Sequence, residues 1–138
     1  MSDGNNFNAK IIEEFRSRGG KVGGMFEKST LLLLHTTGAK TGKERVNPVA
    51  YRPDGDRYVV FGSKGGAPTS PDWYHNLRQN PRAHVEVGTE TFDVVARVAE
   101  GEEREHIWSA QKRDVPAFAE YESKTTRQIP VIILERAG

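Results

Sequence analysis

The sequence contains no cysteine and almost no net charge, with 20 basic and 19 acidic side chains among its 138 residues. Disulfides and thiolate metal sites are therefore excluded, and the charge argues against a general nucleic-acid binder. The longest apolar runs, residues 31–34 and 131–134, are far shorter than the roughly 20 residues that cross a bilayer. The first ten residues lack the apolar core of a signal peptide. We therefore expect one cytoplasmic domain spanning residues 1–138.

Common catalytic and metal-binding motifs are also missing. The four histidines, His35, His75, His84 and His106, show no HxH, HxxxH or HExxH spacing. The sequence therefore predicts no histidine-built metal site. It contains no GxSxG motif of a hydrolase and no GxGxxG motif of a Rossmann enzyme.

The pattern of apolar and turn residues predicts about six short strands with flanking helices. The strands are expected at 30–36, 46–51, 57–61, 83–87, 91–98 and 129–135, and the helices at 5–18, 71–79 and 102–113, with a helical turn at 115–121. Few connections fit repeated βαβ units, so a mostly antiparallel, Greek-key-like barrel of the α+β class, mainly β, is favoured. Ser70 is expected to cap the helix at 71–79, with Pro71 at its first position.

Residues 1–24 are expected to form the first helix and a glycine-rich connector. Phe7, Ile11, Ile12 and Phe15 are spaced to lie on one face of this helix. Such a face packs against the core of the domain or lies on a membrane surface. Packing against the core is favoured, because a first helix must bury its apolar stripe somewhere.

Charge is unevenly distributed along the chain. Residues 1–70 hold 11 basic and 7 acidic residues, a net charge of +4, whereas residues 71–138 hold 9 and 12, a net charge of −3. The positive excess lies mostly between residues 38 and 64, where Lys40, Lys43 and Arg45 accompany two glycines. Exposed amides and cations of this kind bind phosphate or carboxylate. A solvated basic face is the alternative interpretation.

Two further segments suit a planar ligand. Residues 61–68 read FGSKGGAP, and small residues there would let a ring lie against the backbone. Residues 71–77 follow, where Trp73 could form the wall of a ring site and Asn76 lies one turn later on the same helical face. Trp and Leu at the spacing of Trp73 and Leu77 are, however, more often simply core residues.

Taken together, these segments resemble one known family. The motifs are TTGAKTGKERVNP, GSKGGAP, DWYHNLRQNPRAHVEV and RQIPVIILE, and they extend from about residue 31 to residue 135. Their order and spacing resemble the deazaflavin-dependent nitroreductases, the coenzyme F420-dependent quinone reductases of actinobacteria. The resemblance implies a split β-barrel related to flavin reductases, with F420 bound noncovalently and no metal.

The resemblance also implies which residues contact the cofactor. The anionic phosphate and tail side would meet Lys40, Thr41, Arg45, Val46 and Asn47. The deazaflavin ring and its linker would lie between two groups: Phe61, Gly62, Ser63 and Lys64 on one side, and Asp72, Trp73, Tyr74, His75 and Asn76 on the other.

The implied reaction is hydride transfer from C5 of the reduced deazaflavin to a quinone, typically menaquinone, or to another small electrophile. Members that activate nitroimidazoles surround the substrate with several tyrosines. Here the matching positions are Ala50, Val115, Phe118 and Tyr121, and Ser63 matches a serine that bonds the substrate or helps to donate a proton. We therefore expect Ser63 and Tyr121 to be catalytic and nitroimidazole activation to be weak or absent.

Other functions stay open at this point. A non-catalytic F420 carrier or storage protein would keep the cofactor residues without a substrate pocket, and related barrels bind flavin mononucleotide instead. A barrel that binds single-stranded nucleic acid needs exposed aromatic residues among basic ones, and most aromatic residues here stand in apolar runs. Oligomeric state is left open, as is peripheral contact with the inner face of the plasma membrane.

Overall fold

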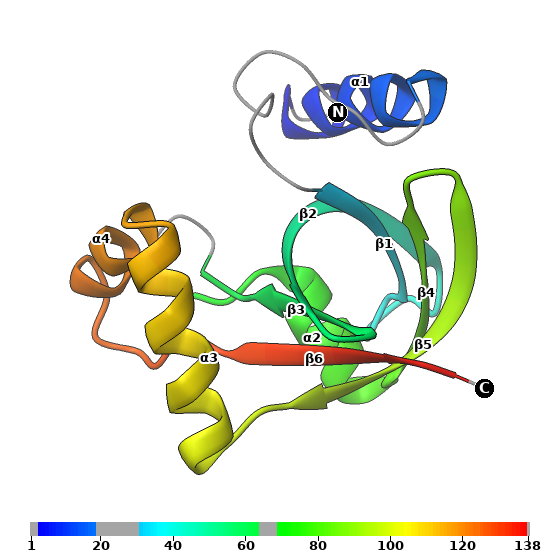
Figure 1. Ribbon diagram of the computed structural model, residues 1–138. Helices are drawn as coiled ribbons and strands as arrows, with labels where there is room; N and C mark the ends of the chain where they lie inside the picture. The colour runs from blue at the N-terminus through cyan, green and yellow to red at the C-terminus, as the bar shows by residue number, and fades with distance from the viewer. Residues whose placement is uncertain (1–2, 19–30, 64–68, 138) are drawn as a thin grey trace.

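Six antiparallel strands close into a barrel in the order β1-β2-β3-β6-β5-β4 (Figure 1). The computed structural model describes residues 3–18, 31–63 and 69–137. The strands are β1 (Leu31–Thr37), β2 (Glu44–Asp54), β3 (Arg57–Phe61), β4 (Arg82–Val87), β5 (Glu90–Val98) and β6 (Val131–Arg136). The helices are α1 (Asp3–Ser17), α2 (Asp72–Gln79), α3 (Gly101–Asp114) and α4 (Ala117–Ser123). The predicted barrel class is confirmed, and each predicted strand is present.

The start of α2 differs from the prediction. The helix begins at Asp72, and Pro71 is the extended residue before it, with φ −66° and ψ 156°. Ser70 makes no capping bond; its Oγ accepts a hydrogen bond from Arg127 Nη1 at 3.2 Å. The hydroxyl is therefore used to hold a distant loop rather than to cap the helix.

The barrel interior holds one continuous core. Leu32 and Leu34 of β1 pack there with Ile132 and Leu134 of β6. One face of α2 closes this core, because Trp73 and Leu77 both belong to the same cluster. Alternate side chains of a strand point to opposite faces, so the residues between these must pack elsewhere.

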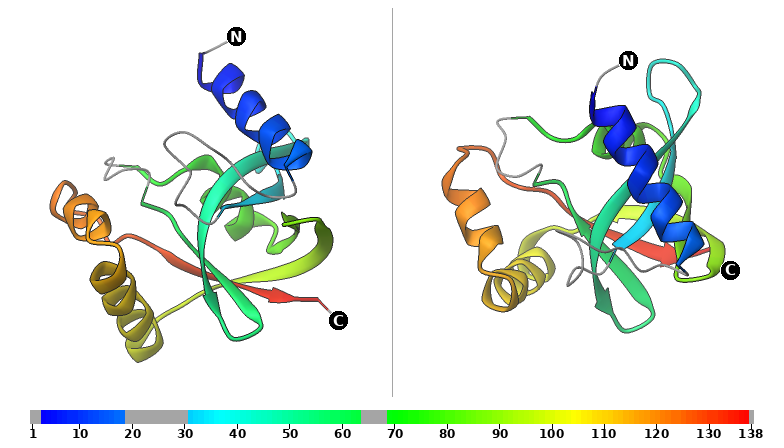
Figure 2. Two further views of the ribbon diagram at one scale, coloured as in Figure 1. Left: turned by 45° about the horizontal axis from the view of Figure 1, so that its top comes forward. Right: turned by 90° about the horizontal axis from the view of Figure 1, so that it is seen from above.

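Helices cover the outer faces of β1 and β6. Leu31 and Leu33 point outward beneath Ile11 and Phe15 of α1, and Val131 and Ile133 lie under α3 beside Trp108. Figures 1 and 2 show α1 lying across the barrel near β1 and β2, with α3 and α4 together on another side. Both four-residue apolar runs are therefore strands buried on two faces, which explains why they do not alternate with polar residues.

The apolar face of α1 packs against the barrel, which confirms the interpretation favoured from the sequence. Ile11 is 6% exposed and Phe15 is 1% exposed, and burying side chains of this size stabilises a fold by roughly 1.5–3 kcal/mol each. The side chain of Phe7 and the connector at 19–24 lie outside the residues described. Among those described, no helix is long and apolar enough to span a bilayer.

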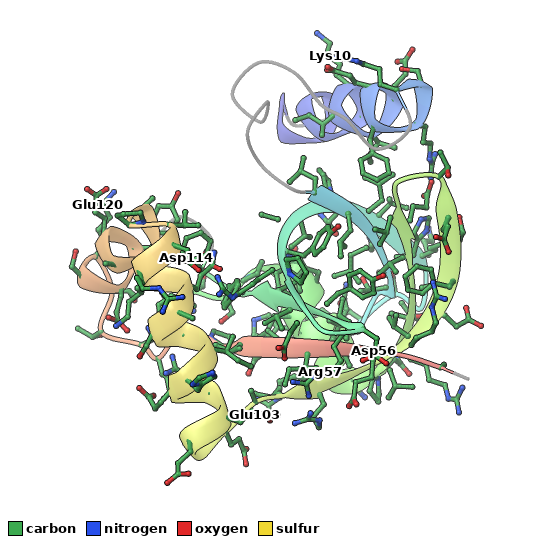
Figure 3. All side chains as sticks on the ribbon, in the orientation of Figure 1. Lys10, Asp56, Arg57, Glu103, Asp114 and Glu120 are labelled. Atoms are coloured by element: carbon green, nitrogen blue, oxygen red, sulfur yellow. The ribbon has the colours of Figure 1, made fainter. Side chains whose placement is uncertain are left out.

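Ion pairs tie α3 to the barrel. Glu103 of α3 accepts hydrogen bonds from Arg97 Nη1 of β5 at 2.6 Å and from Arg57 Nη1 of β3 at 3.4 Å (Figure 3). Arg97 also pairs with Glu135 of β6. These pairs lie beside the apolar contact between α3 and the barrel, so they fix the direction of the helix more than they add stability.

Candidate functional site

The turn between β1 and β2 is tight and internally bonded. Gly38 N–H donates to Lys43 O at 2.7 Å, and Gly42 N–H donates to Gly38 O at 2.8 Å. Gly42 has a φ of +69°, which glycine adopts without strain. A Cβ at Gly38 would lie 2.7 Å from Thr41 Oγ1. The two glycines are therefore required by the turn itself, and the turn displays Lys40 and Lys43 to solvent.

Asn76 holds this turn against α2. Its Oδ1 accepts a hydrogen bond from Ala39 N–H at 2.9 Å, and its Nδ2 donates to Thr36 Oγ1 at 3.1 Å. Asn76 is only 6% exposed and Thr36 only 2%. A buried amide with both ends bonded has one preferred orientation, so it positions the turn precisely relative to the helix.

A cavity of about 780 Å³ lies between the turn, β2, α2 and α1. It brings together eight of the predicted cofactor residues: Lys40, Thr41, Arg45, Val46, Asn47, Asp72, His75 and Asn76. Ala9 and Ile12 of α1 also line it. The sequence did not indicate this contribution, because the apolar stripe of α1 predicted only that the helix packs somewhere.

Three cations beside this cavity lack acidic partners among the residues that the structure describes. Lys40, Lys43 and Arg45 form no ion pair there, whereas Arg16, Arg52, Arg57, Arg97 and Arg136 all do. Glu44 of β2 also lines the cavity, and its carboxylate is directed at His35 and His84. Asp72, another lining residue, lies in the first turn of α2. Unpaired cations at a cavity rim are available for an anionic ligand.

The segment after β3 is held from two sides. Gly62 N–H donates to Pro130 O at 3.0 Å, and a Cβ at Gly62 would lie 2.9 Å from Pro130 Cγ. Arg127 Nη2 donates to Ser63 O at 3.0 Å. Ser63 itself is 8% exposed, and Lys64 lies outside the described residues. Arg127 was not among the predicted site residues, and only the tertiary structure shows that it supports Ser63.

Phe61, Gly62 and Ser63 do not line the cavity around Asn76, and neither do two predicted cofactor residues of α2, Trp73 and Tyr74. Trp73 is 7% exposed and packs in the barrel core. Tyr74 is half-buried and lines a second cavity of about 660 Å³, together with Arg78, Arg104 and Arg127. The structure thus places Trp73 in the core packing that the sequence left open as an alternative.

Two of the predicted substrate residues, Phe118 and Tyr121, lie beside Phe61. Its ring centroid is 5.4 Å from that of Phe118, which is 5.3 Å from the ring of Tyr121. These two residues belong to one aromatic cluster, formed by Phe61, Trp108, Phe118 and Tyr121. Tyr51 pairs with Val60, so Ala50 of β2 lies on the same outer face as Phe61. Val115 follows α3 and is 39% exposed.

Glu122 fixes α4 beside this cluster. Its carboxylate accepts hydrogen bonds from the Trp108 indole N–H and from Lys112 Nζ, the latter at 3.0 Å. These donors favour the ionised form, so the pKa of Glu122 lies below its ordinary value of 4.5. The charge of Glu122 therefore helps to hold Phe118 and Tyr121 in place.

Comparison with known protein families shows to which family the chain is related. A family model described as F420H(2)-dependent quinone reductase matches residues 9–136. The chain belongs to this family. An F420H(2)-dependent quinone reductase of Mycobacterium tuberculosis is 38% identical over 126 residues, which cover 88% of this chain and 85% of that protein. A putative F420H(2)-dependent quinone reductase of the same organism is 40% identical over 119 residues, covering 83% and 97%.

Solved structures agree with membership of the F420H2-dependent quinone reductase family, an oxidoreductase family. The structure of an F420-H2 dependent reductase is 44% identical and superimposes with a TM-score of 0.69, covering 76% of this chain and 93% of its own. A domain-swapped dimer is 38% identical with a TM-score of 0.72, covering 96% and 98%. A putative pyridoxamine 5'-phosphate oxidase from Listeria innocua, 15% identical with a TM-score of 0.58, covers 82% and 88% and shares the fold alone.

Proposed function

We propose that this chain is an F420H2-dependent quinone reductase that binds the deazaflavin coenzyme noncovalently and reduces a menaquinone-like quinone. The observation that carries this proposal is a pair of cations, Lys40 and Arg45, which line the cavity between the β1–β2 turn and α2 and form no ion pair with any described residue. Family membership supplies the class of reaction. The proposal for this chain rests on how its own residues fit the ligand.

The cavity suits the anionic part of the coenzyme. Phosphodiester and glutamate carboxylate groups need cations and N–H donors, and Lys40 and Arg45 are both exposed to the cavity and unpaired within the described residues. Asn76 holds the turn in one place before any ligand binds. A preorganised turn loses little conformational entropy on binding, which favours affinity.

Beyond the cavity, the Phe61 cluster would receive the acceptor. When bound, the reduced coenzyme supplies the hydride, and the quinone takes up that hydride and one proton to become a quinol. The exposed Ala50 and the half-buried Phe118 offer apolar contacts suited to a quinone ring, with the buried Phe61 behind Phe118. Ser63 and Tyr121 bring hydroxyl groups, which we propose hydrogen-bond the quinone oxygen and help to deliver the proton there.

The same surface explains why we propose weak or absent nitroimidazole activation. Ala50, Val115 and Phe118 carry no hydroxyl group. These three side chains would therefore offer a nitro group no hydrogen bond to stabilise the charge that develops on it during reduction.

The first experiment is an anaerobic assay. Purified protein is mixed with reduced F420 and menadione, and the return of the oxidised deazaflavin's visible absorbance is followed against an enzyme-free control. Acceleration supports the reductase, and a much slower rate with a nitroimidazole supports the proposed selectivity. Binding of F420 by fluorescence quenching without turnover would contradict the reductase and indicate a carrier. Yellow protein from a host that lacks F420 would indicate flavin mononucleotide as the cofactor.

A further inference from the structure

A cluster of two histidines and two carboxylates lies on the wall of the barrel next to α1. His35 of β1 and His84 of β4 are partners in the antiparallel register. Their rings stack with centroids 4.2 Å apart and planes 23° from parallel. The two residues are 49 positions apart in the sequence, so no spacing motif could indicate their proximity.

Glu44, at the start of β2, completes a set of three ligand-type groups. Its Oε1 lies 3.1 Å from His35 Nδ1, and its Oε2 lies 3.6 Å from His84 Nε2. One ligand atom from each of the three residues can be chosen so that all lie within 4.8 Å of one another. The three groups come from three different strands and converge on one point.

The other ring nitrogen of His35 is already engaged. His35 Nε2 lies 2.6 Å from Glu86 Oε2, and Glu86 also accepts two hydrogen bonds from Arg16 of α1, at 3.0 and 2.6 Å. A carboxylate that accepts the N–H of a histidine fixes its tautomer. With Nε2 directed at Glu86, Nδ1 is the ring nitrogen of His35 that is directed at the carboxylate of Glu44.

Two imidazoles, one from β1 and one from β4, are directed at the two oxygens of this one carboxylate, at 3.1 and 3.6 Å. One ion placed between the three groups could bind all of them. The arrangement of Glu86, His35 and a cation is the carboxylate–histidine–metal geometry of many metal sites, in which the outer carboxylate orients the ligand.

We propose that His35 Nδ1, His84 Nε2 and the carboxylate of Glu44 bind a divalent first-row transition ion of the Zn²⁺ class. Two imidazoles and one carboxylate suit such ions, with bonds of about 2.0–2.2 Å and water completing the coordination. The side chains of Glu44 and His84 are 58% and 36% exposed, so both can move the short distance needed to close on the ion. His35, 9% exposed, is the fixed ligand.

The ion would join β1, β2 and β4 beside the Arg16–Glu86 pair that anchors α1. Binding would therefore stabilise the folded chain in proportion to the free-ion concentration. This effect depends only on residues of the cluster, so it can be measured without coenzyme or quinone.

The test is a titration of tag-free, metal-depleted protein with Co²⁺, followed by its visible absorption, and with Zn²⁺ in competition with a chromophoric chelator. We expect one ion per chain and a melting temperature that rises with Zn²⁺ concentration. The His84→Gln variant should bind at least tenfold more weakly, and Glu86→Gln roughly 10–100-fold more weakly, because the outer carboxylate orients His35. His106→Gln, which removes an exposed histidine of α3, should bind as the unmodified chain does.

Two results would overturn the proposal. One is a folded protein, verified by circular dichroism, that develops no Co²⁺ band. The other is equal affinity in His84→Gln and His106→Gln, which would place the ion elsewhere. Because His84 and Glu86 are partly exposed, these variants test the site without removing the buried His35.

Discussion

At the scale of single residues, the sequence indicated the chemistry of the cavity but not how its groups are held. Lys40 and Arg45 could be recognised because cations near glycines are visible in one short segment. The bonds of Asn76 to Ala39 and Thr36 could not, because they join α2 to a turn 37 positions earlier in the chain. The same holds for Arg127, which supports Ser63 from 64 positions away.

Arg45 offers a direct test of the anion-binding role. Arg45→Ala should weaken F420 binding by about tenfold or more, since a charge-assisted hydrogen bond contributes about 1.5–3 kcal/mol. Lys43→Ala is the matched control, because Lys43 carries the same charge on the same turn but does not line the cavity. Fluorescence titration of F420 measures both. Equal losses in the two variants would mean that general charge, rather than this cavity, determines affinity.

Tyr121 tests the proposed proton donor. Tyr121→Phe keeps the ring contact with Phe118 and removes only the hydroxyl. We expect kcat for quinone reduction to fall at least about tenfold while the Kd of F420 stays unchanged, because the interaction forms only as the proton is delivered. Tyr58→Phe, which removes a hydroxyl at the Tyr51–Tyr58 ring contact instead, is the control. Unchanged turnover in Tyr121→Phe would contradict the role.

At the scale of elements, short helices depend on the tertiary contacts they make. The sequence predicted a helical turn at 115–121, and the structure has α4 at Ala117–Ser123. A helix of this length is marginal by itself, so Phe118, Tyr121 and Glu122 must hold it against α3. Its position beside Phe61 followed from these contacts and not from local propensity.

The pH dependence of α4 follows from Glu122. Its pKa is lowered in the folded chain, so its stabilising contribution is present above about pH 4.5 and is lost as the pH falls through the lower folded value. We expect the hydrogen-exchange protection factors of α4 amides, which correct for the intrinsic pH dependence of exchange, to fall below about pH 4.5, and the Glu122→Gln variant to show this loss of protection already at neutral pH. Glu120→Gln, at an exposed position of the same helix, controls for charge. Identical exchange in the two variants would exclude a role for the Glu122 contacts.

At the scale of the whole molecule, helices on the outside of the barrel change how much each strand residue contributes to the stability of the fold. Leu32 faces the barrel interior and Leu33 faces α1, yet both are 0% exposed. In a barrel with a solvated outer face, replacing the outward-facing one of two neighbouring residues would change the free energy of unfolding only slightly. Here both faces of β1 are buried.

We therefore expect Leu32→Ala and Leu33→Ala to lower the free energy of unfolding by similar amounts, about 2–5 kcal/mol each. Thr37→Ala, at the exposed end of the same strand, should have little effect. Urea denaturation measures all three. A small effect for Leu33→Ala alone would mean that α1 contributes little to the stability of the fold.

The sequence by itself determined the strands, the barrel class and the basic turn, because each depends on neighbours within a few positions: apolar runs, paired turn residues, and cations beside glycines. The tertiary structure alone decided which groups meet. The register between β1 and β4 places His35 opposite His84. The packing of α2 buries Trp73 in the core and places Asn76 within hydrogen-bond distance of the β1–β2 turn. Such contacts depend on how strands align and helices pack over long separations in the chain, which no local pattern encodes.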